Sequence, residues 1–283
     1  MVQGKTVFQT TCFTKDVLMK IKRAYNASHP HQKIVSNSPK TIFKELQQRL
    51  SHCTKEDCWL KVLSKKETQF LKNHLFAPKQ PSKWAKNPNE WLSNFDILNV
   101  LQQYEQKYPH FVFIGPTTID FDTTLPEYNN HCVEQKLCDF HVSHYVKKNV
   151  NKIGVIFNLD KHDEKGSHWV SLFIDLQHKI IFFFDSAGNK TPKEINHFVE
   201  KIKKQGMEMK KPLNFTFYEN YPTTHQESNT ECGMYSLFFI ITMLTGNTQY
   251  HKNMSLKKKI SLFKNEKIHD KYVEKLRNIY FNQ

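Results

Sequence analysis

The sequence predicts an α+β fold in which a helical N-terminal region precedes a core of strands and helices. Three observations support this class. Residues 1–76 carry short amphipathic helical patterns, and residues 153–184 contain three short apolar strands. Residues 234–244 form a run that is apolar except at Ser236 and Thr242 and that indicates a buried helix. With 283 residues, 39% of them hydrophobic, the chain can build one large domain or two smaller ones.

The N-terminal region is expected to form a domain of its own. An apolar stripe recurs at three- and four-residue spacing over residues 41–50, and a weaker stripe follows over residues 60–75. Three prolines within residues 78–88 then exclude a continuous helix and indicate a linker. We therefore expect a basic, mostly helical arm over residues 1–85 and a core over residues 86–283.

Positive charge is concentrated in this N-terminal region. Residues 1–90 contain 17 Lys and Arg against 6 Asp and Glu, which accounts for most of the net charge of +14. Such an excess suggests a surface that docks on an acidic partner, and nucleic acid is the first candidate. The alternative is a solvated, lysine-rich helical face, and the sequence leaves both open.

The composition is typical of a protein that folds in a reducing, soluble compartment. No stretch approaches the ~18 apolar residues of a membrane span, and residues 1–5 do not lead into the apolar region of a signal peptide. The six cysteines are expected to be thiols, since nothing indicates a secreted chain.

Two clusters combine histidine with cysteine: His52, Cys53 and Cys58, and His131, Cys132, Cys138 and His141. Neither has the spacing of common structural zinc sites, so no metal or cofactor is expected.

The elements of the core can be read in order. A helix is expected over residues 91–101 with Ser93 or Asn94 as its N-cap, whereas residues 109–150 give a mixed signal. Further elements are expected as strands at residues 153–157, 168–174, 180–184 and 215–218, a helix from Pro192 to about residue 205, and helical structure over residues 256–281. The short turn between the second and third strands predicts an antiparallel hairpin.

Cys232 lies where a polar segment gives way to the apolar run, so it is expected in the first turn of a helix. There, unpaired N–H groups and the helix dipole favour the thiolate. A cysteine nucleophile is one interpretation, and a small core residue is the other. Ser228, Asn229 or Thr230 is the expected N-cap.

The predicted hairpin supplies partners for this thiol. His168 opens one strand and Asp185 follows the other, so antiparallel pairing places both at the same end of the sheet. His168 could take the proton of Cys232 while Asp185 holds the imidazole in the productive tautomer. Gln226, six residues before Cys232, could form an oxyanion hole with the Cys232 backbone N–H. Each residue alone has an ordinary structural explanation, but the four in this order predict a catalytic site.

Four short motifs occur in the order of a known protease family: His168-Trp169, Asp185-Ser186, Gln226 and Glu231-Cys232-Gly233. Together they resemble the adenain-like cysteine peptidases, which include the proteases that mature and deconjugate SUMO. Trp91-Leu92 resembles the motif that opens the catalytic domain of this family. Within the family, the motifs are most similar to those of the polyprotein proteases of African swine fever virus and other large DNA viruses. The resemblance covers residues 91–245 clearly.

The resemblance implies a papain-like cysteine protease core, in which the Cys232 helix packs on a small central sheet flanked by helices. It implies that His168, Asp185 and Cys232 form a triad and that Gln226 is the oxyanion donor. Trp169 and Trp91 would line a narrow substrate-binding tunnel that admits only glycine, which implies cleavage after Gly-Gly. Core packing is the alternative for both tryptophans.

Two positions bear on how far the resemblance extends. Ser93-Asn94 replaces the acidic residue usual in the Trp-Leu motif, which puts a contact with host SUMO in doubt. Related viral enzymes can carry Asn as the third triad member, so Asn189 is a second candidate behind Asp185.

The resemblance implies a viral cysteine endopeptidase that cleaves polyprotein precursors after Gly-Gly during virion maturation, located in the host cytoplasm at assembly sites and in the virion. Expected partners are Gly-Gly-containing viral polyproteins and, through residues 1–90, nucleic acid or core-shell proteins. One alternative is a protease of host SUMO or ubiquitin conjugates. Another is an inactive protease-fold virion protein that binds DNA, but all four catalytic side chains are present, which favours an enzyme.

Overall fold

A computed structural model describes residues 11–282 of the chain. Residues 1–5, on which the expectation of no signal peptide rests, and the first ten residues of the predicted arm lie outside the described residues. The chain divides into two compact units between Pro78 and Lys79, and each unit is described by itself.

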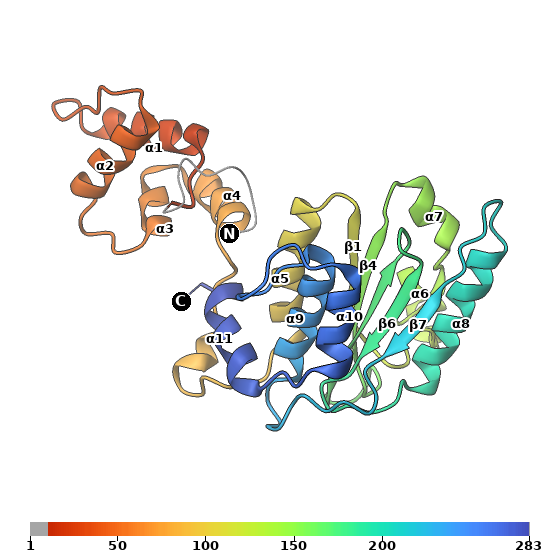
Figure 1. Ribbon diagram of the computed structural model, residues 1–283. Helices are drawn as coiled ribbons and strands as arrows, with labels where there is room; N and C mark the ends of the chain where they lie inside the picture. Colours follow the sequence, from red (N-terminus) through yellow and green to blue (C-terminus); the bar gives the residue numbers. More distant parts are fainter. Residues whose placement is uncertain (1–10, 283) are drawn as a thin grey trace. The chain divides into compact units, whose positions relative to one another are not determined.

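The N-terminal unit is a small helical domain (Figure 1). Its helices are α1 (Lys15–Ser28), α2 (Pro39–Arg49), α3 (Glu56–Trp59) and α4 (Lys65–Leu75). The predicted stripe of α2 is confirmed, because Ile42 and Leu46 are fully buried. They pack with Leu18, Ile21 and Leu60 in one hydrophobic cluster. The basic arm is therefore a folded unit with its own core rather than a charged tail.

The larger unit is built on a five-stranded mixed sheet with the strand order β1-β4-β5-β6-β7. Its strands are β1 (Phe111–Thr118), β4 (Lys152–Asn158), β5 (Trp169–Asp175), β6 (Ile180–Phe184) and β7 (Thr216–Glu219). The predicted hairpin is confirmed, since β5 and β6 pair antiparallel from Ser171↔Phe184 to Asp175↔Ile180. Strand β1, which pairs parallel with β4, was hidden in the mixed signal of residues 109–150. Two short strands, β2 (Thr124–Leu125) and β3 (His131–Cys132), pair outside this sheet.

Helices cover both faces of the sheet, so the expected α+β class is confirmed (Figure 1). On one face lie α5 (Asn94–Lys107), α9 (Cys232–Thr245), α10 (Leu256–Asn265) and α11 (Asp270–Tyr280), and on the other α6 (Gln135–Cys138), α7 (Val142–Lys147) and α8 (Lys193–Met207). Helix α9 is buried from Cys232 to Leu244 because it packs between the sheet and the helices around it. In residues 11–282, no helix has both the length and the apolar composition needed to cross a membrane.

Two predicted helix caps have different outcomes. Ser93 caps α5, where its side chain and that of Asp96 form a reciprocal capping box. The predicted cap of α9 is wrong, because Glu231 occupies the N-cap position and no side chain caps the helix. The residues proposed for that role are used differently: the N–H of Ser228, for example, donates to Asp270 at 2.7 Å.

The expectation of free thiols is wrong for four cysteines. Disulfides join Cys53 to Cys58 and Cys132 to Cys138. The short separations bring the Cα atoms to 5.5 and 6.4 Å, within the range of about 4.4–6.8 Å that a disulfide requires. His52 lies beside the first pair, but a disulfide removes the thiolates that a metal would need. Among the described residues, Cys12 and Cys232 are the free cysteines.

Candidate active site

Cys232 is the first residue of α9 and is 1% exposed. The helix begins here because the apolar run that follows can be buried along its whole length. The first N–H groups of a helix have no intrahelical acceptor, so they form a positive environment for a thiolate or an oxyanion. This placement is the one that the sequence predicts for a cysteine nucleophile.

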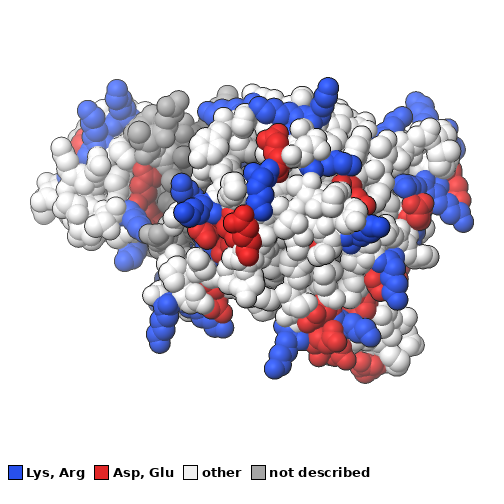
Figure 2. Space-filling model, turned by 60° about the horizontal axis from the view of Figure 1, so that its bottom comes forward, with Lys and Arg blue, Asp and Glu red and all other residues white. Residues whose placement is uncertain are grey.

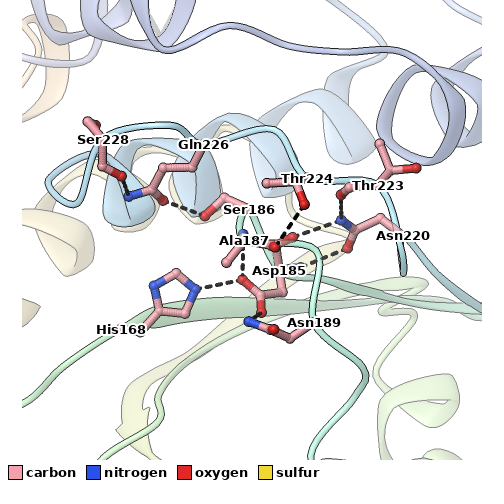
Figure 3. A network of polar contacts seen from close by, with 10 residues as sticks. All are labelled: His168, Asp185, Ser186, Ala187, Asn189, Asn220, Thr223, Thr224, Gln226 and Ser228. Atoms are coloured by element: carbon pink, nitrogen blue, oxygen red, sulfur yellow. Dashed lines mark hydrogen bonds and ion pairs between the residues drawn. The ribbon is translucent and has the colours of Figure 1, made fainter.

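His168 and Asp185 are brought together by the hairpin (Figure 3). His168 directly precedes β5 and Asp185 directly follows β6, and antiparallel pairing places them side by side. The imidazole Nε2 lies 2.6 Å from Asp185 Oδ1. This bond occupies one ring nitrogen and leaves Nδ1 to interact with the Cys232 thiol.

The Asp185 carboxylate is held in a fixed orientation (Figure 3). Its Oδ1 also accepts from the backbone N–H of Ala187 at 2.8 Å, and Oδ2 accepts from the side-chain amide of Asn189 at 2.9 Å. Asn220 bonds the Asp185 backbone on both sides, accepting from its N–H at 2.8 Å and donating to its C=O at 2.7 Å. Asp185 is therefore the histidine partner, and Asn189, the second candidate, supports the carboxylate instead.

Electrostatic interactions in the site favour a charged histidine. Burial alone would lower the pKa of His168, but hydrogen bonds to Asp185 and Cys232 and the charges of both raise it to about 10. Burial likewise would raise the pKa of Asp185, but the bond and charge of His168, with the Ala187 and Asn189 donors, hold it below its ordinary value. At neutral pH the imidazolium can therefore act as counter-ion to a thiolate.

Gln226 lies in the loop that leads to α9, and its amide is bonded at both ends (Figure 3). Its Oε1 accepts from the hydroxyl of Ser186 at 2.7 Å, and its Nε2 donates to the Ser228 carbonyl at 2.6 Å. Each amide nitrogen carries two protons, so one N–H remains for an oxyanion. The carbonyl of Ser186 also accepts from the Gln226 backbone N–H at 2.9 Å. Ser186, the residue after Asp185, thus orients the predicted oxyanion donor.

The two predicted tunnel tryptophans have different environments. Trp169 is 8% exposed, and its indole N–H donates to the Leu92 carbonyl at 3.1 Å. Trp91 is 38% exposed. Leu92 also packs against Gly233, the residue after Cys232, since a Cβ added to Gly233 would lie 3.0 Å from the Leu92 Cβ. The close approach of Leu92 therefore favours glycine after Cys232, because a Cβ there would be crowded.

The loop before His168 is ordered by Asn158, the last residue of β4. The Oδ1 of Asn158 accepts from the backbone N–H groups of Asp160 at 3.0 Å and Ser167 at 3.1 Å. Both ends of the loop are thereby tied to the sheet. A function in shaping this loop accounts for an asparagine at that position.

This arrangement is suited to acyl transfer through a thioester. A Cys232 thiolate can attack a peptide carbonyl, and the Gln226 amide with the N-terminal N–H groups of α9 can bind the oxyanion that forms. The His168 imidazolium can then protonate the leaving amine, and as neutral imidazole it can activate the water that hydrolyses the thioester. Neither step requires a metal or a cofactor.

Sequence reasoning missed three supports of the site. Ser186 orients Gln226, Asn220 fixes the backbone of Asp185, and Asp270 accepts from the backbone N–H groups of Glu227 and Ser228. Ser186 could have been suspected from its place next to Asp185. The other two come from distant segments, and no local pattern marks them.

Comparison with known proteins identifies the family of this site. A model of the Ulp1 protease family, C-terminal catalytic domain, matches residues 138–280, half of the chain. A putative thiol protease of Acanthamoeba polyphaga mimivirus is 29% identical over 260 residues, which cover 83% of this chain and 81% of the relative.

Relatives from African swine fever virus point the same way. A protein described as a SUMO-1 cysteine protease is 29% identical over 172 residues, covering 59% of this chain and 62% of the relative. The crystal structure of the protease of that virus superposes with a TM-score of 0.63 at 20% identity, over 99% of this chain and 94% of that one, which shows a shared fold. The chain belongs to the Ulp1 protease family and is a cysteine protease.

Proposed function

We propose that this chain is a viral cysteine endopeptidase that cleaves polyprotein precursors after Gly-Gly during virion maturation. The observation that carries the proposal is the pairing of His168 with Asp185 at 2.6 Å, next to a thiol at the start of α9. His168, Asp185, Cys232 and Gln226 are the proposed catalytic residues.

The preference for glycine rests on the crowded surroundings of the thiol. Leu92 packs against Gly233 on one side of Cys232, and Trp169 follows the catalytic base. We propose that Leu92 and Trp169 narrow the approach to the thiol so that a substrate Cβ does not fit, and that this selects glycine. We propose that Trp91, which is partly exposed, covers the substrate on binding.

A viral polyprotein is proposed as the substrate because the motifs around Cys232 resemble those of viral polyprotein proteases and the relatives are viral proteins. The mimivirus relative matches over most of both chains, and further relatives come from African swine fever virus. The corresponding sites of action are assembly sites in the host cytoplasm and the virion. Host SUMO is the second candidate, favoured by the description of the African swine fever virus relative as a SUMO-1 cysteine protease.

The N-terminal unit is proposed to dock on nucleic acid or on acidic core-shell proteins. Its exposed cations include Lys15, Lys20 and Arg23 on α1. On the face of the molecule shown in Figure 2, Lys and Arg are interspersed with Asp and Glu. The proposal therefore rests on the net positive charge of residues 1–90.

The substrate proposal is tested by a parallel incubation. Purified enzyme is mixed with a viral polyprotein containing Gly-Gly-X sites, with SUMO and ubiquitin precursors, and with a matched polyprotein in which each Gly-Gly is Ala-Ala. Cleavage of the first substrate alone supports a polyprotein protease. Faster cleavage of the SUMO precursor would favour the second candidate, and cleavage of the Ala-Ala substrate would contradict the glycine preference.

A further inference from the structure

Arg277 is a buried cation on α11 whose side chain reaches the residue before the nucleophile. It is 6% exposed, and its guanidinium hydrogen-bonds the Glu231 carboxylate. Nη2 donates to both carboxylate oxygens at 2.9 Å, and Nε donates to Oε2 at 3.2 Å. The same guanidinium lies over the ring of Trp84 at 4.5 Å. Such a fork fixes a carboxylate in both distance and direction.

Glu231 directly precedes Cys232, so the contact with Arg277 also holds the backbone next to the thiol. It is the N-cap residue of α9, adjacent to Cys232, and it is fully buried. An N-cap side chain normally bonds the first N–H groups of its own helix, but Glu231 makes no such bond. Its carboxylate accepts from Arg277 and, at 3.3 Å, from the Thr230 hydroxyl, so the first turn of α9 is anchored to α11 through the Arg277 pair.

The third contact of Arg277 reaches the segment of residues 90–92. Its Nη1 donates to the Glu90 carbonyl at 3.0 Å. Two residues later, Leu92 packs against Gly233 and its carbonyl accepts from Trp169. The segment that Arg277 holds therefore contacts the residue after the nucleophile and the residue after the base.

A second residue of α11 anchors the loop before Cys232. Asp270 accepts from the Ser228 N–H at 2.7 Å and from the Tyr235 hydroxyl at 2.9 Å. The loop that carries Gln226 and the first turns of α9 are thus both tied to α11. Asp270 holds this loop at Ser228, and Arg277 holds it three residues later, at Glu231.

We propose that Arg277 is a positioning residue that fixes the Cys232 thiol relative to His168 and the substrate-binding segment 90–92, by bridging Glu231 and the Glu90 carbonyl. The inference rests on the proposed function, in that Cys232 is taken as the nucleophile. Arg277 does not touch the reacting atoms. It acts through the backbone on both sides of them.

The test compares Arg277→Lys and Arg277→Met with the wild-type full chain. A misplacement of about 1 Å can lower a rate by about 100-fold, so we expect kcat on a Gly-Gly-X peptide to fall roughly 10- to 100-fold with little change in KM. Lysine keeps the charge but not the fork, so Arg277→Lys is expected to show the defect even if Arg277→Met does not fold. The alkylation rate of Cys232 by iodoacetamide at neutral pH, measured on its own peptide by mass spectrometry, is expected to fall as well.

Lys259→Met is the matched control. Lys259 is a buried cation that donates to the Met243 carbonyl at 2.7 Å, at the opposite end of α9. Its loss is expected to change the unfolding temperature but not kcat or Cys232 alkylation. Arg277→Lys with kcat and alkylation within about twofold of wild type, whatever its stability, would overturn the inference.

The alkylation readout separates this inference from the proposed function. If Cys232 is alkylated as fast in His168→Ala as in wild type, the catalytic assignment itself is rejected. If His168→Ala and the Arg277 variants all lower the Cys232 alkylation rate and Lys259→Met does not, the positioning role is supported even if the Gly-Gly peptide proves to be a poor substrate.

Discussion

His168 Nε2 lies 2.6 Å from Asp185 Oδ1, although the two residues are 17 positions apart in the chain. The same hairpin carries a second histidine–aspartate pair at its other end, where His178 Nδ1 lies 2.9 Å from Asp175 Oδ2. The two pairs share their chemistry and their hairpin, but only the first lies beside Cys232. The second pair is therefore an internal control for the first.

Replacing the proposed base should slow the reaction of the thiol. We expect His168→Ala to reduce alkylation of Cys232 near pH 7 roughly tenfold or more, because the thiolate loses its cationic partner. His178→Ala is the control and should leave that rate unchanged. Equal rates in the two variants would show that His168 and Cys232 do not act as a pair.

The raised pKa of His168 predicts an alkaline limit to proteolysis. The imidazolium that protonates the leaving amine is lost as pH rises through about 10. Alkylation of Cys232 needs only the thiolate and should persist above that pH. Asp185→Asn removes the carboxylate that raises the pKa, so it should move the alkaline limb of kcat/KM toward neutral pH.

The free energy of unfolding should also depend on pH through the protonation of His168. Because the pKa of His168 is raised on folding, its contribution to the free energy of unfolding is complete below about pH 6.5. The contribution is lost as pH rises through about 10. Urea unfolding of wild type and His168→Ala across this range measures it. An alkaline limb of proteolysis near pH 6.5 would instead indicate an unperturbed histidine.

The contact between Ser186 and Gln226 predicts two graded defects in the oxyanion hole. Gln226→Ala should lower kcat by about 10²- to 10³-fold, the usual loss for one oxyanion donor. Ser186→Ala leaves the amide present but removes the hydroxyl that orients it, so a loss of about tenfold is expected. Thr224→Ala, which removes a nearby hydroxyl bonded to the Ala187 carbonyl, is the control. A full effect in Thr224→Ala and none in Ser186→Ala would reject this orientation.

Charge reversal on α1 tests the proposed role of the N-terminal unit. The variant Lys15→Glu, Lys20→Glu, Arg23→Glu changes exposed residues and leaves the core of the unit intact. We expect weaker binding to double-stranded DNA and a shallower salt dependence, by up to about 0.9 per lost phosphate contact. Turnover of a short peptide should not change. Unaltered DNA binding with impaired turnover would assign the unit to catalysis instead.

The sequence predicted those parts of the fold that local patterns determine. The hairpin of β5 and β6 and the apolar helix α9 each appear as one continuous segment, and their ends carry His168, Asp185 and Cys232. Strand β1 was not recognised, because its role depends on a parallel partner, β4, that lies about 40 residues later in the chain. Pairing of that kind leaves no local signature.

The supports of the site were not predictable for a similar reason. Arg277 and Glu231 are 46 positions apart, and Asp270 and Ser228 are 42 positions apart. Only the packing of α11 beside α9 brings them together. The prediction for the N-cap of α9 is wrong because Glu231 takes that position while its side chain pairs with Arg277, a contact that no local pattern reveals. The cysteine pairs were mispredicted because composition alone does not reveal which thiols lie within bonding distance.

The most direct test of the central claim is to incubate wild type and Cys232→Ala with a polyprotein that contains Gly-Gly-X sites and to identify the new termini by mass spectrometry. Cys232 is the first residue of α9 and is almost fully buried, so the smaller alanine should leave the fold intact, which circular dichroism can check. We expect wild type to release fragments that end in Gly-Gly and the variant to release none. Cleavage at these sites by Cys232→Ala, or wild-type cleavage only at sites without Gly-Gly, would contradict the assignment.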